Sequence, residues 1–368
     1  HDDAISYNFR DHKITVYISN VSLVMEYLDL WDSFTDRIST IYLPDKKRPM
    51  IPPVLTETLL SLDEKKRRFC YALDIFFDEN NKIINQQLKL CVAYISKNYS
   101  HDQKDVYESN KYYNKISEIL KINNSKDIVT YLMIHFNKYL ADYLCSMNIG
   151  IYRHYHGMDN DKIMKFDEES TMSSIEKSKI PKSVLFHISN FKTHSSRYCL
   201  LQNYDTNSET NALYLQGSSP IRRIVDIINN IAILKSLLSN NEHFQKANIF
   251  YKHWTSPEQL EYINISSRTI RKVQSKCQIY ARYLHDKENA ISQIYEGYVF
   301  DKLEKYDGKF QYMAYLPYLK LTTYITVLQN LENYSSHLFK LFVFMNQEQD
   351  KNKIKLQLCY VSKNKDLI

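Results

Sequence analysis

Glycine and tryptophan are scarce in this chain, and long apolar runs are missing. Of 368 residues, 5 are glycine and 2 are tryptophan, which excludes collagen-like and glycine-rich repeats. No stretch of about 18 apolar residues occurs, and no signal peptide or other targeting pattern is visible, so no membrane-spanning helix is expected. These absences predict a cytoplasmic protein, or one in an equivalent organellar or viral-factory compartment, with no membrane partner.

The cysteines are not spaced as metal ligands or as a disulfide framework. No Cys-x-x-Cys pair occurs among them, which indicates reduced thiols rather than a zinc site. His154-x-His156 could hold a metal from a strand, but without a third ligand nearby we expect both histidines to be structural. The six cysteines are Cys70, Cys91, Cys145, Cys199, Cys277 and Cys359.

What the chain does have is tyrosine and a mild excess of basic residues. It carries 31 tyrosines and a formal net charge of +6. The positive charge favours a polyanionic partner only weakly, because a total says nothing about where the charge lies. Tyrosines can stack on unpaired bases, although most are needed for packing. A chain of this length has room for about two domains.

The most informative stretch covers residues 214–226 and reads Tyr-Leu-Gln-Gly-Ser-Ser-Pro-Ile-Arg-Arg-Ile-Val-Asp. Gly217 interrupts regular structure, and Pro220 suits the first turn of a helix. Arg222 and Arg223 would then leave the start of a buried helix, where free N–H groups and the helix dipole favour a phosphate. Two solvated arginines are the alternative. The apolar positions at helical spacing are Ile224, Val225, Ile228, Ile231, Leu234, Leu237 and Leu238.

Three parts of the chain resemble the ribonuclease II/R family, in the same order along the sequence. Residues 218–223, Ser-Ser-Pro-Ile-Arg-Arg, are similar to the family's Thr-Ser-Pro-Ile-Arg-Arg segment. Tyr-Leu-Pro at 42–44, Pro-Met-Ile-Pro at 49–52 and Leu-Ser-Leu at 60–62 resemble the family's Tyr-Leu-Pro, Pro-Met-Leu-Pro and Cys-Ser-Leu. His-Asp-Asp-Ala at 1–4 resembles the end of the family's acidic signature, Asp-x5-Asp-x-Asp-Asp-Ala.

The resemblance implies an α+β fold, with an RNB-type mixed sheet and surrounding helices followed by a small S1/OB-type β-barrel. The implied domains are residues 1–288, an RNB-type exoribonuclease catalytic domain that is N-terminally truncated, and 289–368, an S1-type OB-fold RNA-binding barrel. Beyond residue 290 the sequence itself changes to apolar and aromatic strands separated by polar turns, which is typical of a five-stranded barrel. Those strands are expected at 291–300, 310–318, 338–345 and 353–361.

Periodicity predicts the remaining elements. A hairpin is expected over 4–19, and two long strands over 68–77 and 82–96 with a turn between them. A short strand is expected at 151–153, and irregular structure at 159–182. Helices are expected over 27–41, 103–122, 125–147, 195–203 and 256–285.

The resemblance also implies a metal-dependent nuclease site. Asp2 and Asp3 would be catalytic and hold Mg²⁺, and Arg222 would be catalytic through the scissile phosphate. On a regular strand two adjacent aspartates face opposite ways, so both reach one site only if the backbone bends; taken alone, such a pair is usually solvated. By resemblance, the RNA-binding residues are Tyr42, Arg223, Ser219, Arg153 and Tyr298. The alternative for Tyr42 is a tyrosine that only packs in its loop, and the alternative for Tyr298 is a barrel with a purely structural role.

The implied function is a 3′→5′ exoribonuclease that uses Mg²⁺ and hydrolyses single-stranded RNA processively, with RNA threaded into a channel. Single-stranded RNA is the expected partner, with a larger RNA-processing complex as a further one. A second hypothesis is a catalytically degenerate RNB fold kept as an RNA-binding or scaffolding subunit. It is motivated by the first two aspartates of the signature, which the chain does not show, and by substitutions at family acidic and histidine positions. These substitutions are Thr130, Tyr131, Lys272 and Asn230.

Overall fold

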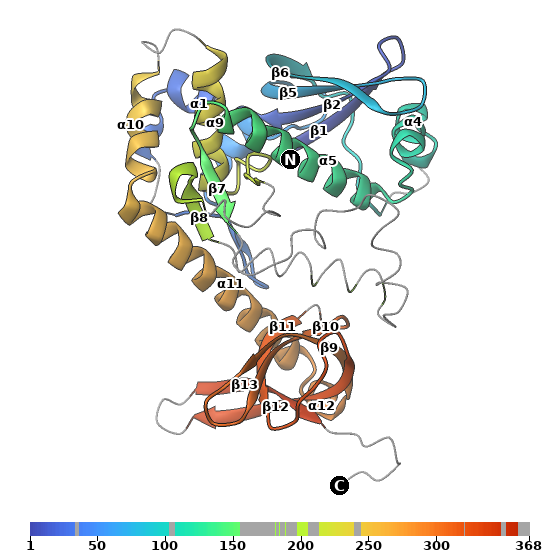
Figure 1. Cartoon of the computed structure of the whole chain (residues 1–368), viewed down its shortest axis with the longest axis vertical. Coiled ribbons are helices and arrows are strands. Elements are labelled where there is room, and N and C mark those ends of the chain that lie inside the picture. Colours follow the sequence, from blue (N-terminus) through green and yellow to red (C-terminus); the bar gives the residue numbers. More distant parts are fainter. Residues whose placement is uncertain are drawn as a thin grey trace. The chain divides into compact units, whose positions relative to one another are not determined.

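The computed structural model divides the chain into two compact units of mixed helices and strands (Figure 1). The first unit comprises 1–41, 48–154 and 197–267, and the second 42–47, 155–196 and 268–368. The α+β class is confirmed, while the boundary expected at residue 288 stays a prediction. Among the described residues, no helix is long and apolar enough to cross a membrane. The structure describes residues 1–33, 37–102, 107–154, 181, 184, 188, 197–204, 213–238, 244–319, 321–346 and 351–359.

An antiparallel sheet of four strands forms the frame of the first unit. Its order is β1-β2-β5-β6, with β1 at Asp3–Asn8, β2 at Lys13–Ser19, β5 at Arg67–Phe77 and β6 at Ile83–Tyr94. The expected hairpin and both long strands are therefore confirmed. The turn after β5 forms because Asp78 Oδ1 accepts hydrogen bonds from the backbone N–H groups two and four residues later, at 2.9 and 2.7 Å.

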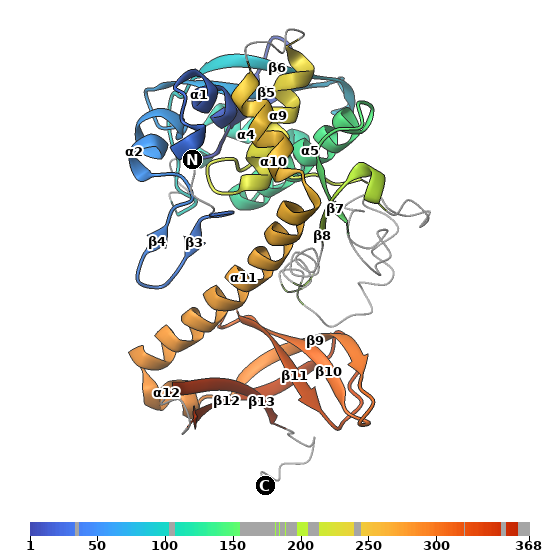
Figure 2. The ribbon, with the colours of Figure 1, turned by 90° about the vertical axis from the view of Figure 1, so that its left-hand side faces the viewer.

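Helices cover one face of this sheet (Figures 1 and 2). The expected long helix is confirmed as α5 (Ser125–Cys145), and Asn124 caps its start. Helix α4 (Lys111–Leu120) is shorter than expected, because the Asn110 side chain accepts hydrogen bonds from the N–H groups two and three residues later and so caps a new helix start. Residues 103–106 lie outside the described part. The shared core includes Tyr71, Leu73 and Ile75 of β5 and Leu132, Phe136 and Leu140 of α5.

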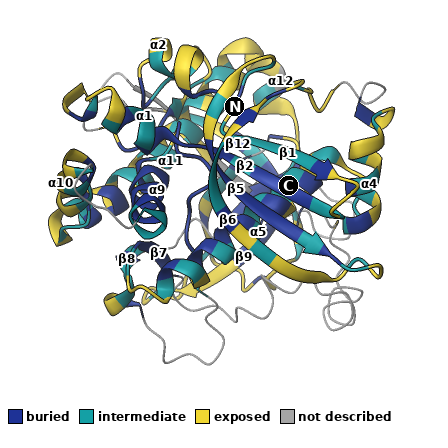
Figure 3. Cartoon of the chain, turned by 90° about the horizontal axis from the view of Figure 1, so that it is seen from above, coloured by how far each residue is buried: buried dark blue, intermediate teal, exposed yellow. Residues whose placement is uncertain are grey.

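Helix α9 (Ile224–Leu237) is confirmed and is buried on all sides through its first three turns (Figure 3). Its N-cap is Arg223, so the expectation that Pro220 lies in the first helical turn is wrong. The reason is a pairing between two segments distant in sequence. Thr40 N–H donates to Arg222 O at 3.0 Å and Ile224 N–H donates to Ile38 O at 2.9 Å, which holds Arg223 extended, with φ −140° and ψ 129°, directly before the helix.

The same pairing explains why the helix expected over 27–41 is wrong. The chain forms α1 earlier, at Val21–Tyr27, because Asn20 Oδ1 accepts from Leu23 N–H and caps the start. Asp29 then takes a positive φ of 55°, which ends a helix. The segment that follows holds η1 (Trp31–Ser33), β3 (Ile41–Tyr42), β4 (Lys47–Arg48), α2 (Pro53–Leu55) and η2 (Thr56–Leu60).

A helix was expected over residues 195–203, and this is wrong for 197–200, while 195–196 lie outside the described part. Residues 197–200 form β8 (Arg197–Leu200), antiparallel to the expected strand β7 (Ile151–His154), and a short 3-10 helix η4 (Leu201–Asn203) follows. Tyr198 shows the cause, since its N–H donates to Asn264 Oδ1 at 2.8 Å and its carbonyl accepts from the same side chain at 3.0 Å. Asn264 belongs to α11 (Pro257–His285), so this expected helix is confirmed. Helix α10 (Gln245–Trp254) precedes it. The irregular segment expected at 159–182 lies almost wholly outside the described residues.

The second unit contains the last 18 residues of α11, then α12 (Lys287–Ser292) and a five-stranded antiparallel sheet (Figure 2). Sheet order is β11-β10-β9-β12-β13, and the two edge strands contact each other, so the sheet curls around its own core. Gly297 is needed there, because a Cβ would lie 2.8 Å from the Phe339 ring. Four strands match the expectation and β11 was not foreseen. The strands are β9 (Tyr295–Glu304), β10 (Phe310–Leu316), β11 (Leu321–Val327), β12 (Ser336–Asn346) and β13 (Lys351–Cys359).

Candidate active site

Asp2, near the N-terminus, contacts the segment that contains Arg222. Ile221 N–H donates to Asp2 Oδ1 at 2.8 Å, and Arg222 Nε donates to Asp2 Oδ2 at 3.2 Å. The backbone is fixed as well, since Ser19 N–H donates to Asp2 O at 3.0 Å. Both carboxylate oxygens therefore have protein donors.

Arg222 is held on three sides but remains open to solvent. Its Nη2 donates to Ser219 Oγ at 2.9 Å, and its carbonyl accepts from Thr40 N–H. Ser219 is itself buried, whereas the Arg222 side chain is 44% exposed. A guanidinium fixed at its Nε and one terminal nitrogen keeps further N–H donors for an incoming anion.

Asp3 is the first residue of β1, paired with Ile18 of β2. Burial raises its pKa, the neighbouring Asp2 charge raises it further, and Arg222 opposes both effects. Burial also raises the pKa of Asp2, against the lowering effect of Arg222 and of the Ile221 N–H. Asp2 precedes the strand, so the two carboxyl groups share the field of one guanidinium despite being adjacent in sequence.

The carboxylate oxygens of Asp2 and Asp3 are the type of ligand that Mg²⁺ prefers, and they would form part of its octahedral coordination shell. Magnesium is often bound through one or two carboxylates, with waters and substrate phosphates completing the octahedron. No group of three acidic, histidine or cysteine side chains placed for a metal occurs in the described part of the chain. A cation beside Asp2 and Asp3 would offset the repulsion and desolvation that raise their pKa values. These are the residues that would hold the ion.

Arg223 points into the fold rather than beside Arg222. Its Nη2 donates to Asp226 Oδ1 at 2.8 Å, and its Nε lies 2.8 Å from Asp226 Oδ2. Asp226 is fully buried and also accepts from Ser219 N–H at 2.7 Å. The pair thereby fixes the residue that orients Arg222.

Arg153 and Arg223 converge on one side chain, Gln216. In the amide orientation that satisfies all its neighbours, the Gln216 oxygen accepts from Arg153 Nη1 at 2.8 Å and from Arg223 Nη1 at 2.9 Å, and its nitrogen donates to Tyr198 Oη at 2.5 Å. The Arg153 guanidinium also lies over the Tyr198 ring, 5.9 Å from its centre. Arg153 is buried, so both arginines expected at the RNA belong to an internal polar network.

Gln216 and Asn229 have positioning roles that the sequence analysis missed. Asn229 donates to Ile151 O and Gln216 O, at 3.1 and 2.7 Å, and accepts from Ile151 N–H at 2.8 Å. Gly217 lies so close to α5 that a Cβ would be 2.7 Å from Leu140 Cδ1. The available signal was the run of polar residues in the first turns of an otherwise apolar helix.

Tyr42 and Tyr298 lie in the second unit. Tyr42 is 43% exposed; its N–H donates to Gln274 Oε1 at 2.8 Å. Tyr298 is 7% exposed and packs in a cluster with Phe300 and Tyr315, so its ring is not presented to solvent. Their RNA-binding roles stay predictions. His154 packs edge-on against the ring of Tyr204, 4.9 Å between centroids, and His156 lies outside the described residues.

Comparisons with known proteins give a family match for the first third of the chain and structural matches for most of it. No curated protein sequence matches the chain. The family model of the RNB domain matches residues 1–117. RNase R of Mycoplasma genitalium in complex with double-stranded RNA superposes with a TM-score of 0.65 at 16% identity, over 97% of this chain and 73% of that one. Residues 1–117 therefore match the RNB domain, and the chain as a whole is similar in fold to RNase R.

Two further structures are similar in fold. Yeast Ssd1, a pseudonuclease, has a TM-score of 0.62 at 13% identity and covers 88% of this chain. An active-site mutant of the Dss1 exoribonuclease from Candida glabrata has a TM-score of 0.56 at 15% identity and covers 93% of this chain. The chain spans 47% of the first of these proteins and 51% of the second. The fold thus occurs in an exoribonuclease and in a pseudonuclease.

Proposed function

We propose that this protein is a Mg²⁺-dependent 3′→5′ exoribonuclease acting processively on single-stranded RNA. The observation that carries the proposal is the contact between Asp2 and Arg222, which are 220 residues apart in the sequence, with the carboxyl group of Asp3 on the next residue. Clustered carboxylates for a cation next to an arginine for a phosphate are what phosphodiester hydrolysis requires. The similar RNase R structures, which are complexes with RNA, support the substrate class.

Each residue has a distinct task. Arg222 binds a non-bridging oxygen of the scissile phosphate through the N–H groups that Asp2 and Ser219 leave available. Ser219 and Asp2 orient it, so little reorganisation is needed when the phosphate arrives. Asp3, with Asp2, would hold Mg²⁺, which when bound neutralises phosphoryl charge and lowers the pKa of a bound water.

Other residues complete the proposal. Tyr42 would stack on a base near the 3′ end, which its exposed ring permits. Arg153 and Arg223 would add positive potential behind Arg222, and Tyr298 would belong to an S1-type RNA-binding barrel over residues 289–368. A cytoplasmic or equivalent compartment and a larger RNA-processing assembly complete the setting we propose.

The test is hydrolysis of 5′-labelled single-stranded RNA by the full chain with and without Mg²⁺. We expect products that shorten from the 3′ end with Mg²⁺, none with EDTA, and loss of shortening in Asp3→Asn. Asp11→Asn is the matched control, because Asp11 is an exposed carboxylate in the turn of the same hairpin. RNA that stays intact with wild type and Mg²⁺, while still being bound, rejects the nuclease proposal.

The second candidate is a degenerate RNB fold that binds RNA without cleaving it. One observation favours it: both oxygens of Asp2 already accept hydrogen bonds from the protein, and Arg222 is balanced by that same carboxylate. The similarity to the pseudonuclease Ssd1 is consistent with this. Binding in filter retention, with no Mg²⁺-dependent shortening, supports the scaffold; failure to bind single-stranded RNA rejects both candidates.

A further inference from the structure

A line of side chains on α11 joins two exposed tyrosines within the second unit. Gln274, Gln278 and Arg282 follow one another at intervals of four residues, so they lie along one face of the helix. Tyr42 lies at one end of this line and Tyr318 at the other. We call the surface formed by Tyr42, Lys47, Gln274, Gln278, Arg282 and Tyr318 the α11 track.

The first end of the track combines an aromatic ring with a cation. Gln274 Oε1 accepts from Tyr42 N–H at 2.8 Å, which fixes the tip of the β3–β4 hairpin against the helix. Lys47 Nζ lies 5.8 Å from the centre of the Tyr42 ring, and both side chains are exposed. A base stacked on this ring would therefore bring its phosphate near an ammonium group.

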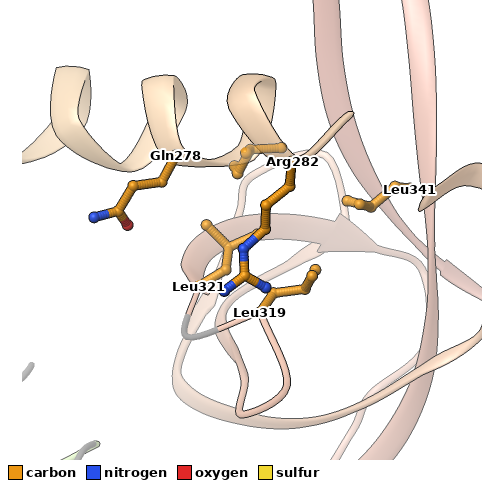
Figure 4. Close-up of a pocket in the computed structure, with 6 residues that line it drawn as sticks. Gln278, Arg282, Leu319, Leu321 and Leu341 are labelled. Carbon is orange, nitrogen blue, oxygen red and sulfur yellow. The ribbon is translucent and has the colours of Figure 1, made fainter. Parts of the chain in front are cut away.

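The second end repeats the combination. Arg282 Nη1 donates to Tyr318 O at 3.1 Å, and Tyr318 is 68% exposed. The Tyr318 ring is braced by Tyr295, with 5.9 Å between centroids and 38° between planes. Figure 4 shows Gln278 and Arg282 leaving the helix above Leu319 and Leu321, which together with Ile279 and Leu341 line a small cleft. Arg282 keeps N–H donors beyond the one used.

Charge along the helix fits a polyanion. From residue 268 to 285 the sequence holds five basic residues, Arg268, Arg271, Lys272, Lys276 and Arg282, and no acidic one. Eight residues separate Gln274 from Arg282, about 12 Å at 1.5 Å per residue. That distance corresponds to roughly three to four nucleotide steps at about 3.4 Å. Stacking rings beside cations, with amides between, is how single strands are bound without sequence preference.

We infer that the α11 track binds single-stranded RNA, with Tyr42 and Tyr318 stacking on bases and Lys47 and Arg282 contacting phosphates. RNA as the ligand rests on the proposed function, but the track's own chemistry requires only an unpaired polynucleotide. In a duplex the bases are stacked on each other, so the rings of the track would have no face to meet.

The experiment is fluorescence anisotropy of labelled oligouridine with the full chain in EDTA, where no hydrolysis occurs. We expect Tyr318→Ala to weaken binding roughly 5- to 150-fold, the range for losing one base stack, and Tyr318→Phe to restore it. Lys47→Ala with Arg282→Ala should lower the slope of log affinity against log salt by about 1.4, or about 0.7 per phosphate contact. Arg10→Ala, an exposed arginine of the first unit, is the control and should change neither quantity.

The outcomes separate this inference from the proposed function. Unchanged affinity and salt slope in all track variants overturn the track, whether or not Asp3→Asn stops hydrolysis. Reduced affinity in the track variants, with RNA that wild type leaves intact in Mg²⁺, supports the track and rejects the nuclease. Equal losses for single-stranded and duplex RNA also overturn it, because stacking then plays no part. Circular dichroism of Tyr318→Phe and Tyr318→Ala confirms that both are folded.

Discussion

Asp2 and Arg222 form an ion pair of 3.2 Å between Oδ2 and Nε, although 220 residues separate them. The arginine is 44% exposed and the aspartate side chain 12%, so solvent screens much of the attraction and its contribution to stability is small. Its effect is geometric. Together with the hydrogen bond from Ile221 N–H, the ion pair fixes the orientation of the Arg222 guanidinium beside the N-terminal end of β1.

Replacing Arg222 by alanine should reduce activity much more than stability. We expect kcat for RNA shortening to fall by about 10²- to 10³-fold, as for loss of one preorganised donor at a developing charge. Arg222→Lys should recover only part, because an ammonium cannot reproduce the fork that contacts Asp2, Ser219 and a phosphate together. Single-turnover hydrolysis and thermal melting measure the two effects. Equal activity in the alanine variant and wild type contradicts this role.

Asp3→Asn should change how stability depends on pH. The folded-state pKa of Asp3 is raised above its ordinary value of 3.8, so the folded protein binds this proton more tightly than the unfolded chain. Stability therefore falls as pH rises from about 4 through the raised pKa. The asparagine variant lacks this loss, so its free energy of unfolding should decline less between pH 4 and pH 7. Urea titrations in EDTA at both values test it, and Asp11→Asn should decline as wild type does.

Asp226→Ala should be strongly destabilising. The substitution leaves the partly buried Arg223 without its carboxylate and the Ser219 N–H without its acceptor. Breaking a buried pair from one side costs about 3–5 kcal/mol. Urea unfolding measures the loss. In the double variant Asp226→Ala with Arg223→Met no buried charge remains, and we expect part of the stability to return; a purely additive double variant would argue against the pair.

Gly217→Ala should destabilise the fold by overpacking. The new Cβ would lie 2.7 Å from Leu140 Cδ1 at a buried position, and overpacking of this kind costs about 1–3 kcal/mol. Because valine has no Cδ atom, the same substitution in a Leu140→Val background should cost less. Unfolding free energies of the four variants form a double-mutant cycle. A coupling energy of zero would show that the contact is absent.

Local patterns in the sequence predicted the elements whose cause is local. The 3.6-residue period of α5, α9 and α11 comes from one or more faces that pack in the core, and the turn at Asp78 comes from its own side chain. The elements predicted wrongly depend on distant partners. Residues 38–40 are extended because they pair with 222–224, and 197–200 form a strand because β7 lies beside them. No window of sequence contains both halves of such a pair.

The candidate site divides in the same way. Asp2, Asp3 and Arg222 were predicted through resemblance; an ion pair joins Asp2 to Arg222, and Asp3 follows Asp2 in the sequence. Their catalytic roles stay predictions. Arg153 and Arg223 were expected at the RNA, but their nearest partners are inside the protein, where Gln216 joins them. Periodicity could not reveal this, because a buried amide that bridges two guanidiniums has no spacing of its own.

Helix α9 carries the arginine segment at its N-terminal end and is buried through its first three turns. A core substitution such as Ile228→Ala therefore removes packing from the support of Arg222 itself. In a host that needs this protein, conditional alleles that fail only on warming should accumulate in α9 and in the α5 side chains that touch it. Sensitivity to heat and loss of function would then map to the same short piece of the gene.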